Sequence, residues 1–477
     1  MNDEITHLSE PNKILTQAEE LASADSICDR FFQRVDWLSF WLTTVLVLAG
    51  YLFTLAPDVT LEKSGLYSTG AMYAGVAHPS GYPVWTIYAW VFTKLPPFSN
   101  IAWRVGVSTA VAGAVTCGII ALMVSRGGML IIEGISGFKR IELREEIQLR
   151  IVCGCIAGLA LGFDGAFWDV AVIVDVWPFT VLLLTLTICL LMRWMYSPAQ
   201  RRYLYAACFV YGLTLTNSQA LLTVAFGLQI FIMFGDWELG REIFFVNCML
   251  LLALIVSEWW GYMYFMDTVT VNLRAYYVSI GIGSGVLCLG LIIWTRKFLT
   301  RWKAALICML MIFLALLMYF YMPIASMTNP PVNWGYARTG EGFFHALTRG
   351  QYERPFPTDS LGRYMEQIRM YGEIAASEFG LVYLFLALIP FCLLHKMRVS
   401  ERKWMLSLLA VYLCLAFLML ALLNPFTDKG GREMVKTFLT ASHVVLAIWT
   451  GCGLILLGSW ITKPAIKPSA PALSSPL

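Results

Sequence analysis

Two carboxylates and one histidine lie close together near the start of the chain. Asp58 and Glu62 follow the first apolar run, and His78 comes sixteen residues after Glu62. A carboxylate can take a proton from a hydroxyl group, and a histidine can position a reacting group or exchange a proton with it. His78 opens the run His-Pro-Ser-Gly-Tyr-Pro at 78–83, whose Gly and Pro residues predict tight turns. This pattern, at the mouth of a membrane helix, is typical of an enzyme that works at the bilayer surface.

The composition predicts a polytopic membrane protein. Of the 477 residues, 58% are hydrophobic and 14% are charged, and the mean hydropathy is +0.67. A soluble domain has about 25% charged residues, so this chain has too little polar surface to cover a globule. The net charge of +3 and the lack of a basic stripe exclude a nucleic-acid partner and leave membrane lipid as the surrounding partner.

The apolar runs predict an all-α bundle with about 12 transmembrane helices. Each run is bounded by charged or turn residues, and most approach the roughly 20 residues that cross a bilayer. A further run at 84–97 is rich in Trp and Tyr but short, which indicates an interfacial or re-entrant helix. The predicted spans are 37–56, 102–125, 149–165, 169–194, 202–216, 219–235, 242–265, 275–295, 303–324, 380–395, 404–424 and 437–461.

Alternate short loops are rich in Lys and Arg, which predicts that they and both termini face the cytoplasm. The chain then divides into a polar arm at 1–36, a membrane domain at 37–461 and a disordered Pro- and Ser-rich tail at 462–477. Two long loops, 57–101 and 325–379, face the other side. Long loops on a rigid scaffold commonly carry binding and catalytic residues.

Polar residues gather on this outer side and predict one polar cavity open to it. Asp175 and Glu258 are expected inside helices, where a carboxylate costs about 2.5–3.5 kcal/mol and usually faces water or a partner. Arginine side chains there could bind a phosphate. No spacing of His, Cys or acidic residues predicts a metal site. The predicted substrate-binding residues are His78, Tyr82, Arg104, Asp164, Asp169, Asp175, Asn217, Asn333, Trp334, Arg338 and Arg432.

Several motifs resemble a bacterial membrane family related to protein O-mannosyltransferases. That family typically shows an acidic-Ser-Gly-acidic pattern in an outer loop and then His-Pro-Pro-Gly-Tyr-Pro. The matching segments, spread over about 37–460, are Leu55-Ala56-Pro57, Ser64-Gly65, His78-Pro79-Ser80-Gly81-Tyr82-Pro83, Ala102-Trp103-Arg104-Val105, Gly212-Leu213-Thr214-Leu215-Thr216-Asn217, Asn329-Pro330-Pro331-Val332-Asn333-Trp334-Gly335 and Arg349-Gly350-Gln351-Tyr352.

The resemblance implies a multi-spanning glycosyltransferase similar to the GT-C class. Such an enzyme would move a sugar, with mannose as the first candidate, from a polyprenyl phosphate to a hydroxyl of a protein or glycan on the extracytoplasmic side of a bacterial inner membrane. The resemblance also implies an outer-loop carboxylate as general base and a basic group near the donor phosphate. It leaves open whether a divalent metal takes part, and it implies no other cofactor.

The chain departs from the family pattern where acidic residues are expected. Lys63 and Leu66 flank Ser64-Gly65, so Glu62 and Asp58 are the remaining carboxylates of this loop. We predict Glu62 as the base, with Asp58 as the second candidate. The base could instead come from Asp164, Asp169 or Asp175.

Two other functions remain compatible with the sequence. One is a transporter or flippase for a polar lipid, in which Asp175 and Glu258 would be the coupling groups; the absence of an internal repeat argues against it. The other is a catalytically inactive relative that binds a lipid or a partner, which Lys63 and Leu66 suggest.

Overall fold

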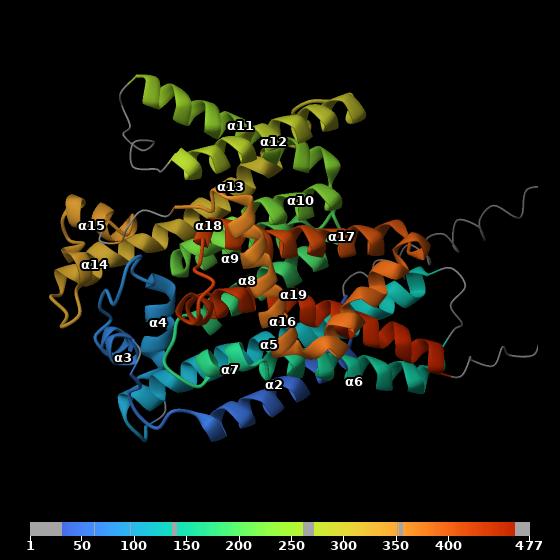
Figure 1. The fold of residues 1–477 in the computed structure, drawn as a ribbon, viewed down its shortest axis with the longest axis horizontal. Helices are drawn as coiled ribbons and strands as arrows, with labels where there is room; N and C mark the ends of the chain where they lie inside the picture. The colour runs from blue at the N-terminus through green and yellow to red at the C-terminus, as the bar shows by residue number, and fades with distance from the viewer. Residues whose placement is uncertain are drawn as a thin grey trace, which may run out of the picture.

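The computed structural model describes residues 31–61, 63–95, 97–135, 141–260, 271–350, 352 and 356–462. The predicted base Glu62 lies outside these residues, as do most of the predicted arm at 1–36 and most of the tail at 462–477. In the described ranges every regular element is a helix, and the predicted all-helical membrane bundle is confirmed (Figure 1).

A long central helix organises the bundle. Helix α5 (Ile101–Gly134) begins at an N-cap, where the Asn100 side chain accepts a hydrogen bond from the Trp103 amide, and most of its side chains are buried. It packs against α2 (Arg34–Thr54), α6 (Leu143–Gly162), α8 (Trp177–Met195) and α19 (Lys429–Ile461). Small residues such as Gly113 and Gly118 let these neighbours approach closely.

The ends of the bundle are clearly distinct. One end carries α3 (Ser64–Met72), α4 (Pro83–Phe92) and α15 (Gly340–Leu347), and we call it the loop end; it lies at the left of Figure 1. At the opposite end α2 begins and α19 ends, both beside the start of α6. There the buried Arg150 guanidinium pairs with Asp36 at 2.8 Å and ties α6 to α2.

Nine described helices are long and apolar enough to cross a membrane, and the number is ten if the bent pair α6 and α7 (Gly165–Ala171) forms one span. The sequence predicts about 12. The difference lies in α9 (Arg201–Asn217), which is 17 residues long and only weakly apolar, and in α10 (Ala225–Gly235), which is 11 residues long. Helix α4 has 10 residues and rises about 15 Å. It is half the length of a span, as the sequence predicts.

The second long loop is shorter than predicted. Helix α16 (Leu361–Cys392) takes up the last part of the expected loop 325–379, so the connection between α14 (Tyr321–Met327) and α16 ends at Leu361, and it contains the short helix α15. The first half of α16 mixes charged and apolar residues, so the sequence does not predict a membrane span there. Gly380 breaks the helix with φ +73°, in the left-handed region that glycine tolerates, and the apolar half follows.

One helical hairpin lies at the side of the bundle. Helix α11 (Trp237–Trp259) packs on α12 (Val271–Thr295), and both lie at the top of Figure 1. The hairpin contacts the rest of the fold mainly through α10 and, less extensively, through α13 (Trp302–Leu316).

Candidate active site

A short ladder joins the two long loops at the loop end. The Val76 amide donates to the Val332 carbonyl at 3.1 Å, and the Trp334 amide donates to the Val76 carbonyl at 3.0 Å. These bonds form an isolated bridge between Val76 and Asn333. Two segments more than 250 positions apart in sequence therefore meet directly before the His-Pro-Ser-Gly-Tyr-Pro run.

The backbone of this run places its histidine and tyrosine side by side. Gly81 has φ +92°, and a side chain there would collide with Met322. Tyr82 has φ +46° and precedes Pro83, which occupies the first turn of α4. The turn stacks the His78 and Tyr82 rings almost in parallel, with an interplanar angle of 6° and ring centres 5.8 Å apart.

His78 has a defined set of hydrogen bonds. Its Nδ1 lies 2.8 Å from the Pro79 carbonyl oxygen, which can only accept, so Nδ1 carries the proton. Nε2 is then an acceptor, and the Tyr352 hydroxyl donates to it at 2.6 Å. The Tyr82 hydroxyl lies 3.2 Å from Nδ1. His78 is therefore held between a tyrosine of its own loop and a tyrosine of the other loop.

Aromatic rings surround this histidine. Tyr67 of α3 contacts both His78 and Tyr82, with ring centres 6.4 and 5.9 Å away. Trp334 lies 5.6 Å from His78 and is 38% exposed. Tyr352 is 43% exposed, whereas His78 is only 4% exposed. We call Tyr67, His78, Tyr82, Trp334 and Tyr352 the histidine–tyrosine cluster; its outer rings are accessible and its histidine is not.

The cluster keeps its histidine neutral. Burial lowers the pKa of His78 to about 4, against the favourable contact with the Pro79 carbonyl, and the positive charges of Lys63 and Arg349 lower it further. Burial also raises the pKa of Tyr82 to about 12. At neutral pH His78 is thus uncharged, and the positive charge near the cluster comes from Lys63 and Arg349.

A carboxylate and a guanidinium flank the cluster. Asp175 lies close enough to add to the effect of burial, which raises the pKa of Tyr67 and of Tyr82. It is half-buried, and its Oδ1 accepts the Trp177 amide at 2.6 Å. Arg349 is half-buried, and its guanidinium lies over the Tyr352 ring, 4.9 Å from the ring centre. A carboxylate near Tyr67 and Tyr82 and a guanidinium over Tyr352 therefore border the same cluster.

Asp175 is positioned by the segment between α7 and α8. The sequence predicts it inside a helix that begins at 169, but α7 ends at Ala171 and α8 begins at Trp177. Pro178 in the first turn of α8 explains the late start, because proline favours that position. Asp175 therefore belongs to a connection at the loop end.

The predicted carboxylates of the first loop lie elsewhere or outside the described residues. Asp58 is exposed, and its Oδ1 accepts the neighbouring Val59 amide at 2.7 Å, as in a turn. Glu62 is not among the described residues. Lys63, which replaces an acidic residue of the family pattern, is exposed and close enough to act on the pKa of His78.

Asp164 belongs to a second, separate group of polar residues. Its Oδ2 pairs with Nδ1 of His443 on α19 at 2.7 Å, and both side chains are fully buried. Its Oδ1 accepts the Phe167 amide and caps α7. Nearby, Lys436 pairs with Glu378 of α16 at 2.7 Å, and Asp169 is exposed beside them. The polar residues that the sequence places around one cavity therefore lie in separate groups, on different helices.

The predicted arginines have local partners away from His78. Arg104 donates to the Phe98 and Thr93 carbonyls. Arg338 donates to the Asn329 side chain at 2.6 Å, and Arg432 pairs with Glu373 at 3.4 Å. These three guanidinium groups organise their own loops and helix ends.

The side-chain amides of the two predicted asparagines, Asn217 and Asn333, bond to backbone groups near the cluster. Asn217 is buried and accepts the Trp85 amide of α4 at 3.0 Å, which fixes the helix that follows the motif. The Asn333 side chain donates to the Ser326 carbonyl at 3.3 Å, at the ladder itself. Both therefore position the loops.

The transporter hypothesis finds little support in these positions. Glu258 pairs with Arg274 at 3.1 Å between α11 and α12, and Asp175 lies outside the helices. Glu258 is next to the last residue of α11, so neither carboxylate lies in the middle of a membrane helix, where a coupling group is expected.

Three residues of this site were not predicted from the sequence: Tyr67, Arg349 and Tyr352. Arg349 and Tyr352 belong to the Arg-Gly-Gln-Tyr segment that matches the family, so a signal for them was present. Tyr67 gave no such signal, because a tyrosine one turn inside a short helix is an ordinary core residue. Within the described ranges no group of three or more His, Cys, Asp and Glu side chains could hold a metal ion.

Comparisons with known proteins match the first half of the membrane domain. A family model for the N-terminal domain of the protein O-mannosyl-transferase TMEM260 matches residues 64–240, which include Tyr67, His78, Tyr82 and Asp175. The mouse (Mus musculus) protein O-mannosyl-transferase TMEM260 is 29% identical over 131 residues, which are 25% of this chain and only 19% of the mouse protein. No solved structure matches the chain. Residues 64–240 are therefore similar to the N-terminal domain of a protein O-mannosyl-transferase.

Proposed function

We propose that this protein is a membrane glycosyltransferase. It would transfer a sugar, with mannose as the first candidate, from a polyprenyl-phosphate donor to a hydroxyl of a protein or glycan on the extracytoplasmic side. The observation that carries the proposal is the histidine–tyrosine cluster with Asp175 and Arg349 beside it. The family match over 64–240 supports the type of reaction.

The reaction needs few groups. The acceptor hydroxyl loses its proton to a carboxylate, its oxygen attacks the anomeric carbon of the sugar, and the bond from that carbon to the phosphate oxygen breaks. The lipid phosphate leaves with the electron pair. A base and a cation beside the phosphate are sufficient, because a phosphate monoester is a stable leaving group.

We assign the base to Asp175 among the described residues. It is half-buried beside the cluster, whereas Asp58 is exposed and engaged in a turn. The matched family segment also begins after Glu62 and contains Asp175. Glu62 stays a candidate, and the experiment below separates the three carboxylates.

We assign the phosphate to Arg349, which replaces Arg104, Arg338 and Arg432 in this role. Its guanidinium lies over Tyr352, and its charge reaches both His78 and Tyr82. The neutral His78 would hold Tyr352 and thereby orient Arg349. Exposed faces of Trp334 and Tyr352 offer flat surfaces with polar edges to a sugar ring.

The test is transfer of labelled mannose from polyprenyl-phosphate mannose in membranes that contain the full chain. Asp175→Asn should reduce the rate about 10²–10⁴-fold, the contribution of a general base, while Asp58→Asn should keep it. Loss of activity in Glu62→Gln with retention in Asp175→Asn would transfer the assignment to Glu62. If the folded wild type shows no transfer with any sugar donor, the glycosyltransferase proposal is wrong.

A further inference from the structure

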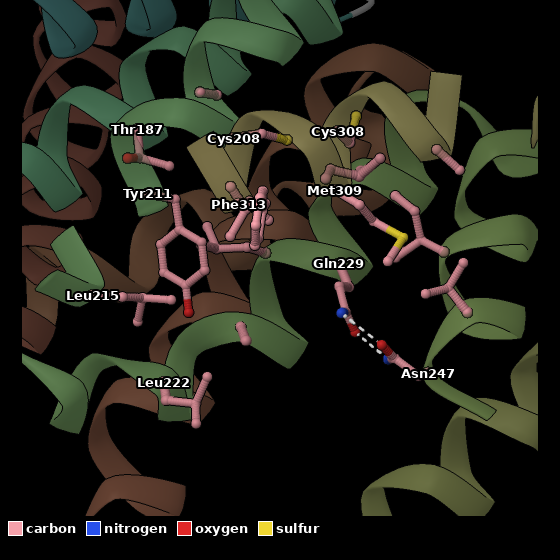
Figure 2. A pocket seen from close by; sticks show the side chains of 18 of the residues that line it. Thr187, Cys208, Tyr211, Leu215, Leu222, Gln229, Asn247, Cys308, Met309 and Phe313 are labelled. Atoms are coloured by element: carbon pink, nitrogen blue, oxygen red, sulfur yellow. Dashed lines mark hydrogen bonds between the residues drawn. The ribbon is translucent and has the colours of Figure 1, made fainter. Parts of the chain in front are cut away.

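An apolar slot runs along the helices next to the cluster. It has a volume of about 330 Å³ and lies between α8, α9, α10, α11 and α13 (Figure 2). On α13 its lining extends from Ala305 to Leu316, twelve residues over which the helix rises about 16 Å. That length is about half of the 30 Å hydrocarbon core of a bilayer. The shape suits a chain better than a compact ligand.

The polar groups of the slot are already bonded to protein. The Gln229 amide donates to Asn247 at 3.1 Å, and the Asn247 amide donates back to Gln229 at 2.7 Å and to Ser284 of α12 at 3.1 Å. Figure 2 shows this reciprocal pair at one wall of the slot. The hydroxyls of Tyr211 and Thr187 donate to backbone carbonyls. The slot therefore offers hydrocarbon surface and few free polar groups, which excludes a sugar as its occupant.

One end of the slot lies near the His-Pro-Ser-Gly-Tyr-Pro run. Leu215 of α9 and Leu316 of α13 line that end. One turn beyond Leu316, the Tyr319 hydroxyl donates to the Leu215 carbonyl at 3.0 Å and lies 3.4 Å from the Ser80 hydroxyl. Ser80 is two residues from His78. A chain in the slot would therefore end beside the residues that we assign to the donor phosphate.

We infer that this slot binds the hydrocarbon chain of an isoprenoid phosphate, with its phosphate directed to Arg349. The inference rests on the proposed function for the position of the phosphate. It adds which helices hold the chain, and it assigns a role to the Gln229–Asn247 pair. That pair ties α11 to α10, so it fixes the side hairpin as one wall of the slot.

The test is photolabelling of the purified full chain in lipid nanodiscs with a diazirine-bearing polyprenyl phosphate that carries no sugar. Labelled peptides should come from α9, α10 and α13. Ala225→Phe places a ring in the slot and should reduce labelling roughly tenfold. Ala253→Phe, at an exposed position of α11 outside the lining, is the matched control and should label as the wild type does. Unchanged thermal unfolding of both variants shows that they are folded.

Competition identifies the ligand class. Unlabelled polyprenyl phosphate should remove the label, whereas the same amount of a diacyl phospholipid should not. Equal competition by both lipids, or equal labelling of the two variants, would overturn the inference. Because the probe carries no sugar, labelling is independent of transfer: labelling in the slot without any transfer would refute the proposed function alone, and transfer without labelling in the slot would refute this inference alone.

Discussion

His78 and His443 are both buried histidines with two very different surroundings. His78 is 4% exposed and lies between tyrosines, one of which is 43% exposed, with Arg349 beside it. His443 is fully buried, and its Nδ1 pairs with the fully buried Asp164 across α6, α7 and α19. His78 therefore lies directly beneath accessible side chains, whereas His443 lies in the interior of the bundle.

The difference shows what makes a polar group available for chemistry. The carboxylate of Asp164 is used twice, in the pair with His443 and in the cap of α7, so it holds helices together. Asp175 and Arg349 are half-buried; Arg349 lies over the accessible ring of Tyr352, and Asp175 lies near Tyr67 and Tyr82. We therefore expect substitutions at the His443 pair to change stability and those at the histidine–tyrosine cluster to change substrate handling.

The largest effect should come from Asp164→Ala. It leaves the buried His443 without its partner and removes the cap of α7, and breaking a buried pair typically costs about 3–5 kcal/mol. Thermal unfolding of the purified protein in detergent measures this loss. Asp58→Ala removes an exposed carboxylate and should change stability by about 0.5 kcal/mol or less. Similar unfolding temperatures for the two variants would contradict the stabilising role that we give to the Asp164–His443 pair.

The next effect concerns acid stability at His78. Its pKa is about 4 in the folded protein and about 6.5 in an unfolded chain. As the pH falls from about 6.5 to 4, the unfolded state takes up a proton that the folded state does not, so stability is full above this range and decreases within it, by at most about 3 kcal/mol. Unfolding temperatures of the wild type and His78→Gln should converge as the pH falls. Parallel curves would refute the assignment of a neutral histidine.

Arg349→Ala should have an intermediate effect on the proposed reaction. Loss of a hydrogen bond to a charged phosphate costs about 1.5–3 kcal/mol, or about 10–150-fold in kcat/KM for the donor. Arg349→Lys keeps the charge and should recover part of this loss. Arg338→Ala, which removes an exposed guanidinium bonded to Asn329, is the control. An equal loss of kcat/KM in Arg338→Ala would show that Arg349 is not the specific binding residue of the donor phosphate.

Tyr352→Phe should have the smallest effect. It removes the hydroxyl that donates to Nε2 of His78 and keeps the ring below Arg349. The net loss of a neutral hydrogen bond is about 0.5–1.5 kcal/mol, which gives roughly a two- to tenfold rise in the donor KM. Tyr336→Phe, at an exposed tyrosine under Arg338, should leave KM unchanged. A larger loss than in Arg349→Ala would mean that the hydroxyl itself contacts the substrate.

The sequence was a good guide to the elements and to one part of the site. The helical membrane bundle followed from apolar runs of span length, and the short helix at 84–97 was expected from its length. His78, Tyr82 and Trp334, all selected from motifs, do lie together in the structure. The count of spans was less accurate, because α9 and α10 are apolar in part but too short.

The rest of the site depended on contacts that sequence spacing does not encode. Asp164 and Asp175 are eleven positions apart, yet α7 directs one into the core and the next connection brings the other beside the cluster. By residue type alone, Arg349 was no better a candidate for the phosphate-binding residue than Arg104, Arg338 or Arg432. In the structure the ladder at Val76 and Asn333 brings the second loop to His78, and within that loop Arg349 lies over Tyr352 whereas Arg338 bonds to Asn329.

Local chemistry therefore determined what the chain alone could show: a helical membrane protein with a Gly- and Pro-shaped turn at His78 and a supply of acids and arginines on the connecting loops. Hydrophobicity and turn propensity act over a few residues, so they can be read without coordinates. Only the tertiary structure decided which acid faces which ring, because that choice depends on helix packing over hundreds of positions, and burial then sets which of the polar groups remain available to a substrate.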